Sequence, residues 1–156
     1  FVGGGAPVVG GGQSVTIECP SINEGFDLHI SGLPTFHLSA VPSYDGGQVF
    51  VEMQDAQTGM RIGHATMDVR YHEGGSDPKT VTPGQQIMMM MEFQGIDAIL
   101  PAGHGMRFVL SDTGEDYLAP ACGSACLVHV LPSLSTFEAP LVDIDFSNVI
   151  ITPQLE

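Results

Sequence analysis

Hydrophobic and polar residues alternate along most of the chain, in short runs that end at turn residues. In one such run Phe26, Leu28 and Ile30 alternate with polar neighbours before Gly32-Leu33-Pro34 turns the chain. A side-chain period of two is that of a β-strand with one buried face. The pattern predicts about nine strands, at residues 15–19, 26–30, 36–38, 49–53, 62–71, 85–93, 106–110, 127–131 and 141–151.

The turns between these runs are rich in Gly, Pro and Asp, and no window keeps a 3.6-residue period over three turns. Regularly spaced short strands with such turns are typical of an antiparallel sandwich or jelly roll. Met88–Met91 is ambiguous, because Met favours helix in isolation. Pro83-Gly84 and Gly95 limit this run to strand length, and a strand buried on both faces would explain four consecutive methionines. We therefore expect an all-β, jelly-roll-type antiparallel β-sandwich.

The 156 residues suit one domain, a sandwich over residues 13–156 that follows a glycine-rich extended segment at residues 1–12. The start on Phe1 and the absence of a signal peptide indicate a chain that was processed or excised from a longer one. An extended N-terminal segment could add a strand to a neighbouring copy. The candidate residues for this assembly are Phe1, Val2, Val8 and Val9.

The charge is strongly negative, with 18 acidic residues against 4 Lys and Arg and a formal net charge of −14. This surface repels nucleic acid and anionic membranes, and no apolar stretch is long enough to insert into a bilayer. It favours cations, and the acidic turn Asp112-Thr-Gly-Glu115-Asp116 is a weak calcium candidate. The turn does not match the EF-hand pattern, and solvated acidic side chains explain it more simply. We expect no cofactor and no metal site.

The three cysteines leave several interpretations open. The spacing of Cys122 and Cys126 suits a small disulfide loop, free buried thiols are an alternative, and a zinc site lacks its second pair of ligands. No Gly-x-Ser-x-Gly string or HExxH motif occurs. Cys126 and His129 are three residues apart, which would place them on opposite faces of one strand. The sequence therefore predicts no catalytic residue.

From about Phe26 to Pro140, the order of motifs resembles the C-terminal domain of X-Pro dipeptidyl-peptidases and cocaine-esterase-like serine hydrolases. The motifs are Ser31-Gly32-Leu33-Pro34, Gln48-Val-Phe-Val-Glu-Met-Gln-Asp-Ala-Gln-Thr-Gly59, Thr82-Pro83-Gly84-Gln85 and Ile99-Leu-Pro-Ala-Gly103-His104-Gly-Met-Arg107-Phe-Val-Leu110. In the last motif Gly105 stands where that family usually has a basic residue.

The resemblance implies a galactose-binding-like jelly roll that packs against an α/β-hydrolase domain carrying the whole Ser-Asp-His triad. It supplies no catalytic residue to this chain. Gly103, His104 and Arg107 carry over as a structural motif, with Gly103 and His104 forming a turn in which His104 anchors the strand that follows.

Three functions remain open at this stage. The first is a non-catalytic accessory module that acts by packing and assembly, with a hydrolase domain or copies of itself as the protein partner. The second is a secreted structural subunit that polymerises into a filament or surface layer through its N-terminal segment. The third is a calcium- or carbohydrate-binding module. We expect a homo-oligomer in an extracellular or cell-surface location.

Overall fold

The computed structural model describes residues 6–114, 117–142 and 149–151, the last three by their backbone alone. Within this part of the chain the fold is all-β, as predicted, with three 3₁₀ helices and no α-helix. No helix there is long and apolar enough to cross a membrane. The strands are β1 (Val8–Val9), β2 (Val15–Cys19), β3 (Leu28–Gly32), β4 (Thr35–Pro42), β5 (Gln48–Asp55), β6 (Arg61–Asp68), β7 (Ile87–Glu92), β8 (Ile96–Leu100), β9 (Met106–Ser111), β10 (Val128–Val130), β11 (Thr136–Ala139), β12 (Leu141–Val142) and β13 (Val149–Ile151). The 3₁₀ helices are η1 (Val69–Tyr71), η2 (Gly123–Ala125) and η3 (Pro132–Leu134).

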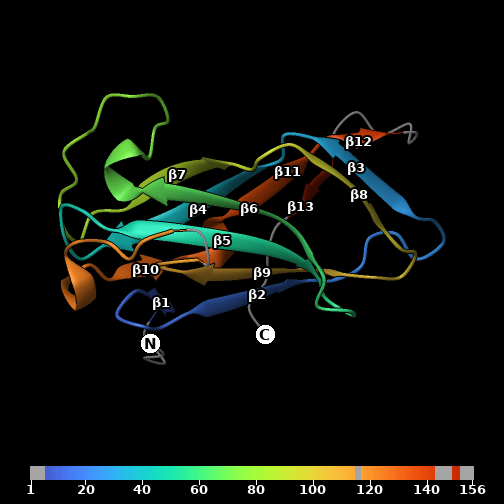
Figure 1. Cartoon of the computed structure of the whole chain (residues 1–156), viewed down its shortest axis with the longest axis horizontal. Coiled ribbons are helices and arrows are strands. Elements are labelled where there is room, and N and C mark those ends of the chain that lie inside the picture. The colour runs from blue at the N-terminus through green and yellow to red at the C-terminus, as the bar shows by residue number, and fades with distance from the viewer. Residues whose placement is uncertain (1–5, 115–116, 143–148, 152–156) are drawn as a thin grey trace.

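The first sheet is organised around β4 (Figure 1). Strand β7 pairs with one side of β4 along its length, while β10 and β11 share the other side. Strand β1 pairs with β10, and β13 pairs with β11. The expected count of nine strands was too low, because β1, β8 and β11 lie outside the predicted runs and the run at 141–151 contains two separate strands.

The second sheet has the order β2-β9-β5-β6, and a smaller third sheet has the order β12-β3-β8. All pairs in these sheets are antiparallel. The predicted strand at 62–71 ends earlier, because the Asp68 side chain accepts a hydrogen bond from the Arg70 amide and begins η1. The described residues thus confirm a sandwich of antiparallel sheets.

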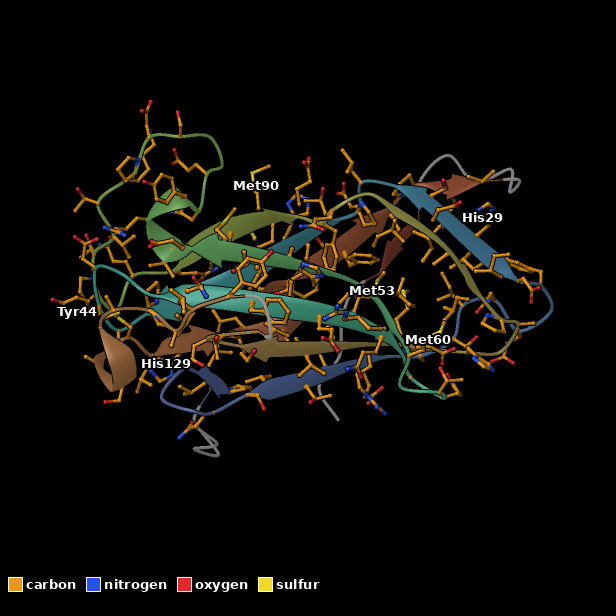
Figure 2. The ribbon with its side chains drawn as sticks, viewed as in Figure 1. His29, Tyr44, Met53, Met60, Met90 and His129 are labelled. Carbon is orange, nitrogen blue, oxygen red and sulfur yellow. A yellow bond between two sulfur atoms is a disulfide. The ribbon has the colours of Figure 1, made fainter. Side chains whose placement is uncertain are left out.

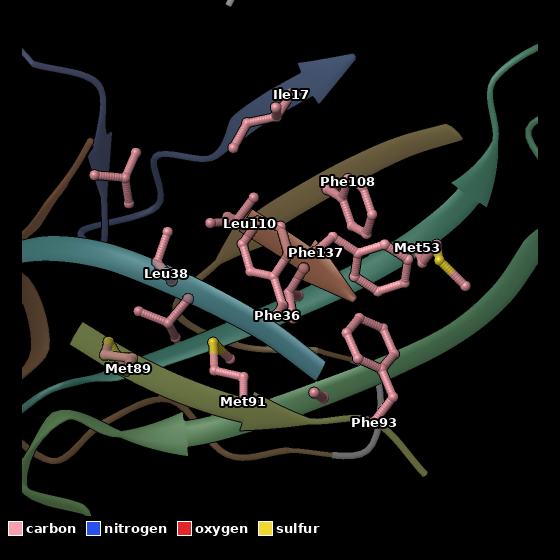
Figure 3. Close-up of a cluster of buried hydrophobic side chains, with 14 of the residues drawn as sticks. Ile17, Phe36, Leu38, Met53, Met89, Met91, Phe93, Phe108, Leu110 and Phe137 are labelled. Atoms are coloured by element: carbon pink, nitrogen blue, oxygen red, sulfur yellow. The ribbon is translucent and has the colours of Figure 1, made fainter. Parts of the chain in front are cut away.

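Four phenylalanines join the first two sheets at the centre of the core (Figure 3). The ring of Phe36 on β4 stacks on Phe108 of β9, with centroids 4.9 Å apart. Phe137 of β11 lies 4.9 Å from Phe108 and 5.9 Å from Phe93. Burial of these rings helps to hold the sheets together, since each ring removes a large apolar area from water.

Strand β7 corrects the expectation of a strand buried on both faces. Met89 and Met91 are fully buried, whereas Met88 and Met90 are 42% and 46% exposed. The reason is the position of β7, which pairs with β4 alone and whose outer face is not covered by a further layer. Consecutive apolar residues on this strand therefore do not indicate two buried faces.

Candidate functional site

A connected group of polar side chains lies where three loops meet, at residues 20–27, 55–60 and 100–105, which we call the loop corner. Asp55 ends β5 and is 1% exposed. Its Oδ1 accepts hydrogen bonds from the amides of Gln57 and Thr58, at 2.8 and 3.1 Å. Its Oδ2 lies 2.7 Å from Nδ1 of His104. The carboxylate thereby holds the β5–β6 turn and the loop before β9 together.

Opposing effects act on the pKa of the Asp55 carboxyl group. Burial by itself raises this pKa, because it disfavours the charged form. The hydrogen bonds from His104, Thr58 and Gln57 favour the charged form, and the net result is a pKa below the ordinary value. Asp55 is therefore a carboxylate at neutral pH, and Nδ1 of His104 must donate the proton in their hydrogen bond.

A buried asparagine connects the remaining loop of the corner. Asn23 is fully buried, and its Nδ2 lies 3.0–3.2 Å from the carbonyl oxygens of Phe26, Leu100 and Pro101. The Gly103 amide donates to the Asn23 carbonyl oxygen at 3.0 Å. These hydrogen bonds join the 20–27 loop to the loop that carries His104. The sequence analysis missed Asn23, since nothing in its neighbours indicates a contact almost eighty residues away.

Of the sequence-derived structural motif, Gly103 and His104 lie in the loop corner, and Arg107 lies beside it on β9. Gly103 has φ = 78°, a left-handed conformation that glycine adopts without strain. Arg107 on β9 donates from Nε to Glu18 of β2 at 2.5 Å, and its guanidinium reaches the carbonyl oxygen of Ala56 at 3.3 Å. The motif thus joins β2, β9 and the β5–β6 turn.

The position of Gly105 leaves no room for a side chain. A Cβ atom built on Gly105 would lie 2.6 Å from the carbonyl oxygen of Cys19, closer than real Cβ contacts. The Gly105 amide also donates to the side chain of Gln57 at 2.8 Å, and its carbonyl oxygen accepts from the Ala56 amide at 2.9 Å. The backbone is therefore fixed on both sides and cannot move away from the added atom.

We expect Gly105→Ala to lower the free energy of unfolding by about 1–3 kcal/mol, the usual cost of forcing extra volume into a packed site. Urea denaturation of the purified chain measures this change. Gly95→Ala is the matched control, because nothing lies within 4 Å of a Cβ at Gly95. Its stability should stay unchanged or rise slightly. Equal losses in the two variants would show that the contact with Cys19 does not limit this position.

The cysteines have distinct environments. Cys122 and Cys126 form a disulfide that spans η2. Cys19 is a free thiol, fully buried, and burial together with the charge of Glu18 raises its pKa to about 12. A protonated thiol is a poor nucleophile. Cys126 precedes β10, so it does not share a strand with His129, and the expectation that the two residues lie on opposite faces of one strand was wrong. The Cys126 sulfur is instead bonded to Cys122.

Two of the four N-terminal candidates for assembly, Val8 and Val9, pair within their own chain. Val8 lies opposite His129 and Val9 opposite Val128, and the Val9 side chain is fully buried. This arrangement differs from the expected addition to a neighbour, because β1 already covers the edge of β10 and gains an apolar contact there. Phe1 and Val2 lie outside the described residues.

The weak calcium candidates are only partly described. Asp112 is half-buried, and its carbonyl oxygen accepts from the side chain of Gln48 at 3.0 Å. Glu115 and Asp116 lie outside the described residues. In the described ranges, no three His, Cys, Asp or Glu side chains are grouped as a metal site would need.

Comparison with known proteins decides the family. Residues 26–133, more than two-thirds of the chain, match the sequence model of the X-Pro dipeptidyl-peptidase C-terminal non-catalytic domain. The chain belongs to this family. The matched region includes most of the loop corner and the whole Gly103–Arg107 motif, whereas β1, β2, β11, β12 and β13 lie outside it. No curated protein sequence matches the chain.

Solved hydrolases share the fold of this X-Pro dipeptidyl-peptidase C-terminal domain. An alpha-amino acid ester hydrolase is similar over 87% of the chain, with a TM-score of 0.63 and 18% identity. An aminopeptidase from a marine sediment archaeon, Thaumarchaeota archaeon, is similar over 88%, with a TM-score of 0.60 and 13% identity. A CocE/NonD family hydrolase from Staphylococcus aureus is similar over 95%, with a TM-score of 0.56 and 8% identity. The similar region is 26%, 26% and 32% of those chains respectively, so this chain spans about a quarter to a third of their length.

Proposed function

We propose that the chain is the accessory domain of a longer hydrolase and acts by packing against a catalytic domain. The observation that carries this proposal is the family match over residues 26–133, to a domain described as non-catalytic. The similar solved chains are three to four times as long as the region they share with this one, which leaves room in each for a separate catalytic domain. The substrate of such an enzyme would be determined by that other domain.

The chemistry of the described residues supports a non-catalytic role. A nucleophilic cysteine needs a thiolate, and burial keeps the Cys19 thiol protonated. The other two cysteines are joined in a disulfide. Nδ1 of His104 is hydrogen-bonded to the Asp55 carboxylate, as in a catalytic base, but this pair also joins two loops of the loop corner. We therefore assign a structural role to the His104–Asp55 pair.

The loop corner is the surface that we assign to the catalytic domain. It lies at the end of the sandwich opposite η1 and η2 (Figure 1). Ile22, Phe26 and Met60, from two of its loops, are 42%, 43% and 58% exposed. Asn23 and Asp55 hold these loops in place through the hydrogen bonds described above. Because the loops are already held in place, their backbone loses little conformational entropy on docking, and the exposed apolar side chains add buried area, which favours a stable interface.

The test uses the natural protein together with the isolated 156-residue chain. Mass spectrometry of the protein from its native source should give a chain about three to four times as long. In that longer protein, replacing Ile22 and Phe26 with Ser should lower the midpoint of thermal unfolding by several degrees, because the domain interface loses apolar area. In the isolated chain, the same replacements should change the midpoint much less.

Leu118→Ser is the control, because Leu118 is 91% exposed and its carbonyl oxygen bonds to Gln48 at the start of β5, at the opposite end of the sandwich. It should have little effect in either protein. A natural protein of only 16.5 kDa would overturn the proposed function itself. A longer protein that responds to the Ser replacements no more than the isolated chain does would overturn only the assigned surface.

A further inference from the structure

The outer face of β7 carries two methionines where a solvent-facing strand usually has polar residues. Met88 and Met90 are almost half exposed, and Met90 points away from the sandwich in Figure 2. They are two residues apart on one strand, so both side chains leave the same face with their Cα atoms about 7 Å apart. Neither thioether is needed for the core, which Met89 and Met91 already fill from the opposite face.

The pairing of β4 with β7 places a histidine beside these methionines. His37 lies directly opposite Met90, and Ser39 lies opposite Met88. Directly opposite residues share a face and have Cβ atoms about 5 Å apart, and a diagonal neighbour such as Met88 is about 7–8 Å away. Met has three rotatable bonds before its methyl group, so both sulfur atoms can reach the His37 ring. We call these three side chains the methionine face.

The ring of His37 is available to a ligand. Its side chain is 23% exposed, and within the described part of the chain neither ring nitrogen makes a hydrogen bond. The nearest carboxylate oxygen is Oε2 of Glu138, 3.8 Å from Nε2. That distance is too long for a hydrogen bond, but a carboxylate at this position can orient the ring and add negative charge beside a bound cation.

Thioether sulfur and imidazole nitrogen together select soft metal ions. Thioethers favour Cu(I), whereas Ca²⁺ and Mg²⁺ require several oxygen ligands, and none of the three side chains of the methionine face supplies one. The net charge of −14 raises the local concentration of any cation. We propose that Met88, Met90 and His37 form a surface site for a soft monovalent metal ion, Cu(I). The site involves binding alone and does not depend on the proposed hydrolase partner.

The experiment titrates the purified chain, with its disulfide intact, with Ag(I) as a redox-inert substitute for Cu(I) in chloride-free buffer. Spectra of methyl-labelled methionine should show two of the eight Met methyl signals moving and saturating at one equivalent. Met88→Leu and Met90→Leu each remove one of these signals and so assign them. The double variant should bind Ag(I) at least tenfold more weakly, and His37→Ala should have a similar effect.

Met60→Leu is the matched control, because Met60 is 58% exposed but lies on the β5–β6 turn. Its methyl signal should not move, and its replacement should leave the affinity unchanged. Cys19→Ala should also bind normally, which tests capture of Ag(I) by the buried thiol. The proposal is overturned if the Met60 signal moves as much as the other two, if the double Leu variant binds as tightly as the natural chain, or if binding is lost in Cys19→Ala. Circular dichroism of each variant verifies that it is folded.

Discussion

Replacing Asp55 with Ala is expected to lower the free energy of unfolding at pH 7 by about 2–3 kcal/mol, because it leaves three hydrogen-bond donors without their acceptor. Those donors are the amides of Gln57 and Thr58 and the Nδ1–H of His104. The loss is moderated because His104 is 26% exposed and can bond to water instead. Urea denaturation of the natural chain and the variant measures the difference.

The same variant has a defined pH dependence. The hydrogen bonds lower the pKa of Asp55 in the folded state, so between that pKa and the ordinary value near 4 the unfolded chain binds more protons. The contribution of Asp55 is therefore complete above about pH 5 and is lost as the pH falls through the folded pKa. The difference between the natural chain and Asp55→Ala should narrow on acidification. A difference that is constant down to pH 2 would contradict the role of the ionised carboxylate.

Asp97→Ala is the control for Asp55. Asp97 also pairs with a histidine, His29, with Nε2 and Oδ1 2.6 Å apart, and its pKa is also lowered. However, the Asp97 side chain is 75% exposed, so water replaces the partner and salt screens the pair. The loss of stability in this variant should be much smaller than in Asp55→Ala. Equal losses would show that burial at the loop corner is not what makes Asp55 important.

The fold class was predictable because the strand period is a local property. Val15 and Ile17, or Phe26 to Ile30, indicate a half-buried strand without reference to the rest of the chain. A family resemblance, and not the local pattern of the chain, identified Gly103, His104 and Arg107 as a structural motif. Their partners Asp55 and Asn23 were missed, since the Asp55–His104 contact joins residues 49 apart in sequence.

The outer face of β7 shows a second limit. Four consecutive methionines have no period, so the sequence could not distinguish a strand buried on both faces from one with an uncovered face. That outcome depends on whether another layer covers β7, which is a property of the tertiary structure. The position of β1 could not be predicted either. It pairs with the edge of β10, a strand more than a hundred residues later in the chain.

Replacing Phe137 with Ala is expected to have the largest effect on stability, a loss of about 3–5 kcal/mol. The Phe137 ring is fully buried and lies among three other aromatic rings, those of Phe36, Phe93 and Phe108 (Figure 3). The smaller side chain loses this apolar contact and leaves a cavity between the sheets. For a chain of this length, the loss corresponds to roughly 6–20 °C in the midpoint of thermal unfolding, measured by circular dichroism.

The result bears on how far the domain extends, because Phe137 lies on β11, beyond the residues that match the family. Phe26→Ala is the matched control, since the Phe26 ring is 43% exposed and its truncation should cost the isolated chain much less. If Phe137→Ala does not fold, Phe137→Leu keeps most of the apolar volume and should lose about 1 kcal/mol. A Phe137→Ala variant as stable as Phe26→Ala would mean that the sandwich is complete without β11. A large loss means instead that residues after the family match supply part of the core, so the structural domain continues beyond residue 133.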